Sequence, residues 1–312
     1  MARWHFRKRT PPKRSVKTPT SESFILDWFS VADISKWKDL NDKILRFHWD
    51  LQSNLAYQRS RVSDQLGKAL LEAAEKNFSF SNWQRVVKYK HALESLSAKG
   101  SLIDPGGRFN VGDGNPSQFA PFPALYIASD KNTAFQETLS QKIEPGQEQH
   151  ALDFSLANPS SIASVSLSGS ISSIINLNQS ERLQPFVNLI KDFSIPNHAK
   201  ETAREMWRKE LELVRTVSNL IAALLDPNWR HPPMQFDVPS ASQIFGQLVN
   251  ETGIEGILYP SKFTGKDCLV IFPQNFDDLS GSFIQLDDEA PAEVKIRRLD
   301  AKVWVELQKS NQ

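Results

Sequence analysis

The sequence predicts an α+β fold in which a helical region precedes a domain that contains a sheet. At 312 residues and 40% apolar composition, the chain can bury a sizeable core. Apolar residues recur at helical spacing from Leu40 towards residue 77, which predicts one long helix or two consecutive ones. After Gly100 short alternating or continuous apolar runs appear between Gly, Pro, Asn and Asp residues, as is typical of strands.

Charge is distributed unevenly along the chain. The first 20 residues hold seven Lys or Arg and no acid, without the apolar segment of a signal peptide, whereas the remainder holds 30 basic against 36 acidic residues. We therefore predict five parts: a disordered basic arm at 1–20, a helical extension at 21–100, the main domain at 101–275 with a helical insertion near 196–228, and a C-terminal strand extension at 276–312.

Several protein classes are disfavoured. No apolar run approaches the roughly 20 residues that span a bilayer, so we expect no membrane segment. The single Cys268 lies in an apolar run, which predicts a buried thiol and a reducing, cytoplasmic compartment. The six histidines are scattered without paired spacing, so no metal site is predicted.

The main domain is predicted to alternate strands with helices. Strands are expected near residues 125, 151, 162, 171, 256 and 268, and two or three more after residue 281. Helices are expected at 131–141, 180–193 and 197–225, and at a segment capped by Ser240 or Ser242 and stopped by Gly253.

The segment GGRFN is the first that carries chemistry. Gly106 and Gly107 predict a turn that places Arg108 at the start of an extended segment. Alternation along that segment would put Arg108 and Asn110 on one face and Phe109 on the other. A guanidinium and an amide would then face one surface together.

The segment ALYIA is predicted to offer an aromatic platform. Leu125 and Ile127 would form the buried face of this strand, while Tyr126 would lie between Ala124 and Ala128 on the opposite face. Two small neighbours leave room for a ligand to stack on the tyrosine.

Two further polar residues follow, each at the edge of an element. Glu137 lies on the helix that Ser129 or Asp130 would cap, and Ser261 follows Pro260 at the end of the strand GILYP. Either residue alone would be an ordinary surface residue.

Taken together, these motifs resemble the RES domain family, which is named for an Arg, a Glu and a Ser. GGRFN, LYIAS, a capped helix with TAFQE, and GILYPS followed by LVIF occur in the family's order from about residue 106 to 273. The resemblance implies a fold related to diphtheria-toxin-like ADP-ribosyltransferases, with a split β-sheet core, and an activity that destroys NAD⁺. The chain is longer than minimal family members.

The resemblance also implies roles for individual residues. Arg108, Glu137 and Ser261 would be the catalytic residues, and Arg108, Asn110, Tyr126 and Ser261 would contact NAD⁺. These side-chain types suit the chemistry, because nicotinamide leaves as a neutral group and the ribosyl cation needs a carboxylate nearby. Arg108 would grip a phosphate, of either NAD⁺ or the attacking acceptor, and Ser261 would position rather than attack.

NAD⁺ would be a substrate rather than a cofactor. In the family, inorganic phosphate is the preferred acceptor and gives ADP-ribose 1″-phosphate, and an Xre-type antitoxin is the usual partner. A glycohydrolase, a protein ADP-ribosyltransferase, or a non-catalytic protein that binds nucleic acid through its basic arm remain alternatives. Homo-oligomerisation also remains open.

Overall fold

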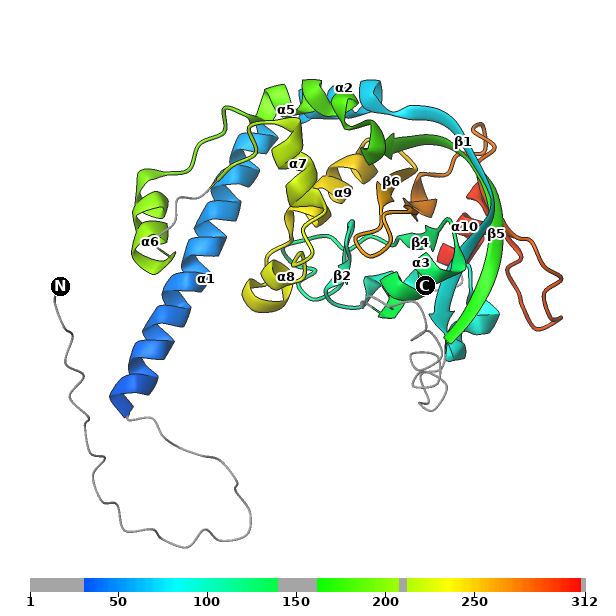
Figure 1. Ribbon diagram of the computed structural model, residues 1–312, viewed down its shortest axis with the longest axis horizontal. Coiled ribbons are helices and arrows are strands. Elements are labelled where there is room, and N and C mark those ends of the chain that lie inside the picture. The colour runs from blue at the N-terminus through cyan, green and yellow to red at the C-terminus, as the bar shows by residue number, and fades with distance from the viewer. Residues whose placement is uncertain (1–30, 140–161, 208–211, 310–312) are drawn as a thin grey trace, which may run out of the picture. The chain divides into compact units, whose positions relative to one another are not determined.

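A computed structural model describes residues 31–139, 162–207 and 212–309 (Figure 1). The chain divides into two units, Met1–Lys43 and Ile44–Gln312. In the first unit the described residues form the beginning of helix α1 (Val31–Ser60), whose remainder belongs to the second unit. The predicted basic arm at 1–20 and the predicted strand near residue 151 lie outside the described residues.

The helical stripe after Leu40 forms two consecutive helices, as predicted. α1 is followed by α2 (Ser63–Ala73), which buries Leu66 and Leu70 on one face. α2 ends at Ala73 rather than near residue 77, because Ala74 already has an extended backbone.

The extension predicted as helical up to residue 100 instead contains a long strand, β1 (Glu75–Lys88). Two asparagines with positive φ, Asn77 and Asn82, interrupt its alternation, and the pairing register shifts between Phe80 and Trp83. These irregularities hide the period of two on which strand prediction depends.

One seven-stranded sheet organises the second unit. Its order is β1-β4-β7-β6-β5-β8-β9, and β1 also pairs with β5, so that the first five strands in this order close on themselves. All these pairings are antiparallel except that of β5 with β6. The remaining strands of this sheet are β4 (Leu125–Ala128), β5 (Ile162–Asn176), β6 (Gly256–Pro260), β7 (Asp267–Ile271), β8 (Phe283–Leu286) and β9 (Arg298–Asp300).

The strand predictions at 125, 256 and 268 are confirmed as β4, β6 and β7, whereas those near 162 and 171 are one continuous strand, β5. β1 and β5 pair along almost their whole length, as Figure 1 shows. Of the predicted terminal strands, two occur as β8 and β9, and the chain then forms a helix, α10 (Ala301–Lys309).

Helices pack on the sheet, and their ends match several sequence signals. α9 (Ala241–Glu251) begins with a capping box of Ser240 and Gln243, and Gly253 beyond its end has a φ of +79°. The segment predicted as one helix at 197–225 contains two helices, α6 (Asn197–Trp207) and α7 (Val217–Leu224). The other helices are α3 (Lys131–Leu139), α5 (Gln184–Ile190) and α8 (His231–Phe236), with 3₁₀ segments Tyr89–Glu94, Lys99–Leu102, Leu177–Leu183 and Pro273–Asn275.

Alternation along β4 divides its side chains between two apolar clusters. Leu125 and Ile127 pack with residues of β5 and α10, while Ala124 and Ala128 pack with residues of α2, α7 and α9. The predicted alternation of ALYIA is therefore confirmed. Within the described ranges, no helix is both long enough and apolar enough to cross a membrane.

Candidate functional site

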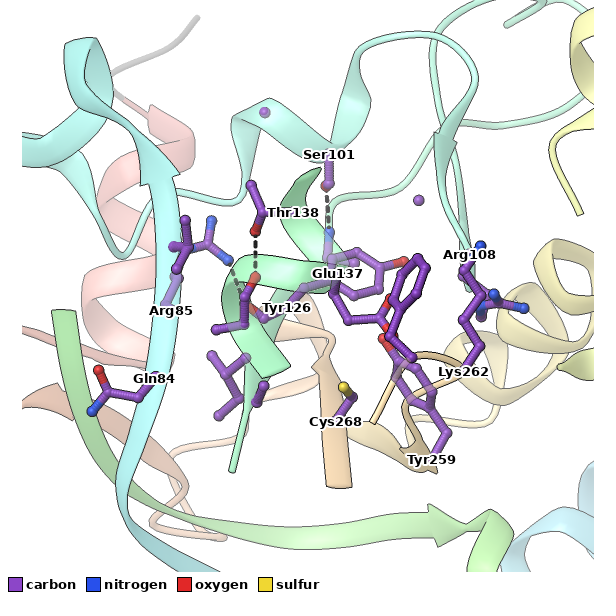
Figure 2. Close-up of a pocket in the computed structure, with 18 of the residues that line it drawn as sticks. Gln84, Arg85, Ser101, Arg108, Tyr126, Glu137, Thr138, Tyr259, Lys262 and Cys268 are labelled. Carbon is purple, nitrogen blue, oxygen red and sulfur yellow. Dashed lines mark hydrogen bonds between the residues drawn. The ribbon is translucent and has the colours of Figure 1, made fainter. Parts of the chain in front are cut away.

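A cavity of about 310 Å³ opens beside β4 (Figure 2). Several segments that are far apart in the chain line it, and their polar side chains include Arg85 from β1, Arg108, Tyr126 from β4, Glu137 from α3, and Arg230. Its size lies at the lower end of the range for small-molecule sites. Three of the five predicted site residues, Arg108, Tyr126 and Glu137, line it, while Asn110 and Ser261 do not.

Arg108 stands at the turn of a small hairpin. β2 (Gly106–Gly107) pairs with β3 (Asn110–Val111), so Arg108 and Phe109 form the two-residue connection. Gly106 has a φ of +90°, a conformation that favours glycine, and its N–H donates to the Ile103 carbonyl at 2.8 Å, so the predicted turn ends at Gly106. The prediction that Arg108 begins an extended segment is wrong, because Gly106 and Gly107 already form β2. Phe109 is fully buried and packs edge-on against Tyr259 with ring centroids 5.0 Å apart.

The Arg108 guanidinium is held from the side of the helical insertion. Its Nη1 donates to the carbonyl oxygens of Leu224 at 3.2 Å and Asp226 at 2.9 Å, where α7 ends. Arg108 is only 6% exposed, and its guanidinium carbon lies 5.8 Å from the ring centroid of Trp229. Its Nε and Nη2 groups make no hydrogen bond to any residue in the described ranges, so they are available to a ligand.

Helix α9 fixes the hairpin from behind. The buried Gln243 amide donates to the carbonyls of Pro105, Gly107 and Asn110 at 2.7, 3.2 and 3.1 Å. One turn later, a Cβ on Gly246 would lie 2.0 Å from the Phe109 carbonyl oxygen, so only glycine allows the helix to approach this closely. α9 therefore sets where Arg108 stands.

Tyr126 presents its ring, and not its hydroxyl, to the cavity. The hydroxyl donates to Asn110 Oδ1 at 2.9 Å and accepts from the Phe109 N–H at 3.0 Å. Burial raises the pKa of Tyr126, despite the hydrogen bond from Phe109 and the positive charge of Arg108, so the phenol is neutral. Ala124 and Ala128 line the cavity together with Tyr126, and the predicted stacking of a ligand on the ring stays a prediction.

Asn110 lies behind the cavity wall, contrary to the expected shared face with Arg108. It is fully buried; its Oδ1 accepts from Gly107 and Tyr126, and its Nδ2 donates to the carbonyls of Ser101 and Phe122. The alternation fails because Arg108 and Phe109 form the hairpin turn, where the extended period of two does not apply. Asn110 positions Tyr126, and a ligand contact by its amide has no support in this geometry.

Glu137 and Ser261 meet through one short hydrogen bond. The Ser261 hydroxyl donates to Glu137 Oε1 at 2.6 Å and accepts from the N–H groups of Phe263 and Thr264 at 3.2 and 3.4 Å. Ser261 is 4% exposed, and Glu137 lines the cavity while Ser261 lies behind it. The serine orients the carboxylate, as expected for a positioning residue.

The beginning of α3 is tied to the same turn. Asp130 caps α3 by accepting from the N–H and hydroxyl of Thr133, and Thr133 Oγ1 lies 2.9 Å from Thr264 Oγ1. Lys266 forms an ion pair with Asp130 at 3.6 Å. These contacts fix the distance between the helix that carries Glu137 and the turn that carries Ser261.

Sequence reasoning missed three cations in the cavity wall: Arg85, Arg230 and Lys262. Arg85 belongs to the unpredicted strand β1. Arg230 follows Trp229 in the short segment between α7 and α8, and a paired Trp and Arg in a loop is a signal that could have found it. Lys262 comes directly after the predicted Ser261.

The cavity carries an excess of positive charge. Among the lining residues that the structure describes, four are cations and one, Glu137, is a carboxylate. Burial, followed by the positive charge of Arg108, lowers the pKa of both Arg230 and Lys262, while Glu137 opposes the shift. A cavity of this composition favours an anionic ligand.

Cys268 and Tyr259 are neutral groups of the wall. Burial, followed by the negative charge of Glu137, raises the pKa of the Cys268 thiol. Burial likewise raises the pKa of Tyr259. The prediction of a buried Cys268 is confirmed, and its raised pKa disfavours a nucleophilic thiolate.

Comparison with known proteins places the chain in a family. A crystal structure described as the M. tuberculosis MbcT–MbcA toxin–antitoxin complex is similar at 15% sequence identity and a TM-score of 0.38, over 78% of this chain and 97% of that one. No curated protein matches the chain. The model of the RES domain matches residues 82–294, about two thirds of the sequence and the whole cavity, and the chain therefore belongs to the RES domain family.

Proposed function

We propose that this protein is a toxin-type enzyme that degrades NAD⁺ by cleaving the bond between nicotinamide and ribose. Membership of the RES domain family supports the assignment, and the observation that carries it is the Glu137 carboxylate, oriented by Ser261 at 2.6 Å. Among the described residues that line the cavity, Glu137 is the one acid, and four cations and several aromatic rings line it as well.

The chemistry follows from the leaving group. When the bond between C1″ and the pyridinium nitrogen breaks, its electron pair neutralises the nicotinamide, so little acid catalysis is needed. The positive charge passes to the ribosyl C1″ and ring oxygen, where a carboxylate stabilises it. We assign this role to Glu137, which would also accept a hydrogen bond from a ribose hydroxyl.

Tyr126 would stack on the nicotinamide. Its ring lines the cavity between two alanines, and its hydroxyl is occupied by Asn110 and Phe109. This arrangement fixes the ring plane before a ligand binds, and reduces the entropy lost on binding.

Inorganic phosphate is the proposed acceptor. A phosphate oxygen would form a bond to C1″ as nicotinamide leaves, which gives ADP-ribose 1″-phosphate. The excess of positive charge in the cavity supports an anionic acceptor. We also propose an ADP-ribosyltransferase-like fold and an Xre-type antitoxin partner, both on the ground of family membership.

Product analysis tests the proposal. Purified protein would be incubated with NAD⁺ with and without phosphate, and the products would be identified by mass spectrometry. We expect nicotinamide and ADP-ribose 1″-phosphate only when phosphate is present, and a loss of about 100-fold or more for Glu137→Gln. The matched control is Glu72→Gln, on the exposed face of α2, which should retain full activity.

Each other outcome has a defined meaning. ADP-ribose formed without phosphate would identify a hydrolase, and label transferred from NAD⁺ to protein would identify a transferase; either would refute the phosphate acceptor. Equal nicotinamide release by the parent and Glu137→Gln would refute the site. For the toxin role, induced expression should arrest growth with Glu72→Gln and not with Glu137→Gln.

A further inference from the structure

The cations of the cavity differ in what their hydrogen-bond donors already contact. Arg85 Nη1 donates to the Tyr126 carbonyl at 3.0 Å and Nη2 to the Ser97 carbonyl at 2.9 Å, while its Nε is buried without a partner among the described residues. Both Nη groups of Arg85 are therefore engaged by backbone carbonyls of the wall, so that only their second N–H groups remain for a ligand.

Arg230 and Lys262 are in the opposite situation. Within the described ranges, neither side chain makes a hydrogen bond or an ion pair. Their cationic groups lie over aromatic rings instead, Arg230 at 4.4 Å from the Trp229 ring centroid and Lys262 at 4.6 Å from that of Phe263. Such contacts hold a cation in place and leave its N–H groups available.

These two cations join Arg108 at one end of the cavity. The Trp229 ring centroid lies 5.8 Å from the guanidinium carbon of Arg108 and 4.4 Å from that of Arg230, so both groups are near the same ring. Arg108 and Lys262 lie on one side of Glu137 and Arg85 on the other (Figure 2). The three groups range from buried Arg108, through half-buried Arg230, to exposed Lys262, as expected for a path from the cavity floor to its mouth.

Three neighbouring cations repel one another in the empty protein, and the carboxylates of Glu137 and, for Lys262, Asp226 offset this repulsion only in part. The charge of Arg108 lowers the pKa of Arg230 and of Lys262, after the larger effect of burial. A ligand with two adjacent negative charges would relieve this repulsion, and planar guanidiniums bind phosphate oxygens in pairs. One phosphate would neutralise fewer of these charges than a diphosphate would.

We propose that Arg230 and Lys262, together with Arg108, bind the diphosphate of the dinucleotide, while the acceptor phosphate binds elsewhere in the cavity. This inference rests on the proposed function, because the diphosphate is that of NAD⁺. It assigns the Trp229-Arg230 pair between α7 and α8, and the lysine after Ser261, to substrate recognition. Under this proposal Arg108 binds the diphosphate of NAD⁺ and not the acceptor phosphate.

Direct binding tests the inference without relying on turnover. Calorimetry would compare ADP-ribose, which keeps the diphosphate, with nicotinamide, which lacks it. Arg230→Gln and Lys262→Met should weaken ADP-ribose binding about 10- to 100-fold, the range for a lost hydrogen bond to a charged group, and leave nicotinamide binding unchanged. Arg230→Lys should recover part of the loss.

Matched controls are Arg61→Gln and Lys295→Met, two exposed cations away from the cavity, which should bind ADP-ribose like the parent. Because Arg230→Gln removes a repelled charge, the empty variant should unfold at a temperature no lower than the parent does. A lower unfolding temperature together with equal losses for both ligands would show a structural role and overturn the inference.

Turnover separates this inference from the proposed function. With nicotinamide riboside, which has no phosphate, Arg230→Gln should match the parent, whereas kcat/KM for NAD⁺ should fall about 10- to 100-fold. An equal fall for both substrates, with a raised KM for phosphate, would place Arg230 at the acceptor and overturn the inference. If no form releases nicotinamide, the proposed function fails, and ADP-ribose binding still decides whether a diphosphate site exists.

Discussion

The two walls of the cavity are built in different ways. On one wall, Glu137 is fixed by a single side-chain hydrogen bond to Ser261, between two segments that both carry family motifs. On the other, Arg108 is fixed by backbone carbonyls at the end of α7, and its hairpin by α9. The Glu137 carboxylate is positioned by its own motif partner, whereas the Arg108 guanidinium is positioned by elements outside the motifs.

Of the changes to the wall that carries Arg108, we expect Arg108→Lys to cause the largest loss of activity. Lysine keeps the charge but cannot donate to the carbonyls of both Leu224 and Asp226 and still face the cavity. We expect kcat/KM for NAD⁺ to fall about 100-fold, the upper part of the range for a lost hydrogen bond to a charged group. Stopped assays of nicotinamide release would measure it, and a change of less than threefold would contradict the assignment.

Gly246→Ala should displace the hairpin without touching any cavity side chain. The new methyl group would overlap the Phe109 carbonyl, so we expect a loss of about 1–3 kcal/mol in the free energy of unfolding, and reduced activity. The matched control is Gly67→Ala in α2, where the nearest atom would lie 3.5 Å away. That control should gain about 0.5–1 kcal/mol in urea unfolding, and the prediction fails if both variants shift alike.

Ser261→Ala tests the hydrogen bond that orients Glu137 on the other wall. The Glu137 carboxylate would remain but lose its orienting hydrogen bond, so we expect kcat to fall about tenfold, less than for Glu137→Gln, with KM nearly unchanged. The backbone N–H groups of Phe263 and Thr264 would lose their acceptor, which adds a modest cost in stability. An effect as large as that of Glu137→Gln would show that Ser261 takes a direct part in the reaction.

Asp130→Asn should have the smallest effect. Burial raises the pKa of Asp130, but hydrogen bonds from Thr133 and the charge of Lys266 outweigh it, so the folded pKa is below the usual value. The resulting stabilisation is present above about pH 4 and is lost as the pH falls through the folded pKa. The parent should therefore lose slightly more stability than Asp130→Asn on acidification, by less than about 1 kcal/mol.

Acid titration of thermal unfolding would measure this difference. Asp192→Asn, in an exposed turn, serves as the control and should follow the parent. If Asp130→Asn also follows the parent through the acid range, the tie between α3 and the 261–266 turn contributes nothing to stability.

Sequence patterns predicted those parts of the fold in which a residue's neighbours in the chain determine its environment. The alternation of ALYIA, the capping of α3 and α9, and the turn at Gly106 follow from local periodicity and turn chemistry. β1 was missed because the positive φ of Asn77 and Asn82 and the register shift between Phe80 and Trp83 break the alternation. β5 was divided in two because its serine-rich centre lacks an apolar run.

Sequence patterns also predicted those residues of the candidate site that have a local signature. Arg108, Tyr126 and Glu137 were found because each has a local signature and the motifs occur in a known order. Arg230 and the support from Gln243 depend on contacts across about 120 to 140 residues of chain, which single-sequence patterns do not encode. Asn110 was misplaced because the period of two was extended through a turn.

The carbonyls of Leu224 and Asp226, at the end of α7 and just beyond it, accept hydrogen bonds from Arg108 and so limit how the helical insertion can vary in length. No described residue of the insertion before α7 lines the cavity, whereas removal of Leu224 or Asp226 would take away a backbone acceptor of the buried Arg108 guanidinium. For protein engineering, the last turn of α7 belongs to the smallest functional unit of this chain, so a minimal RES domain cut from it has to keep that turn.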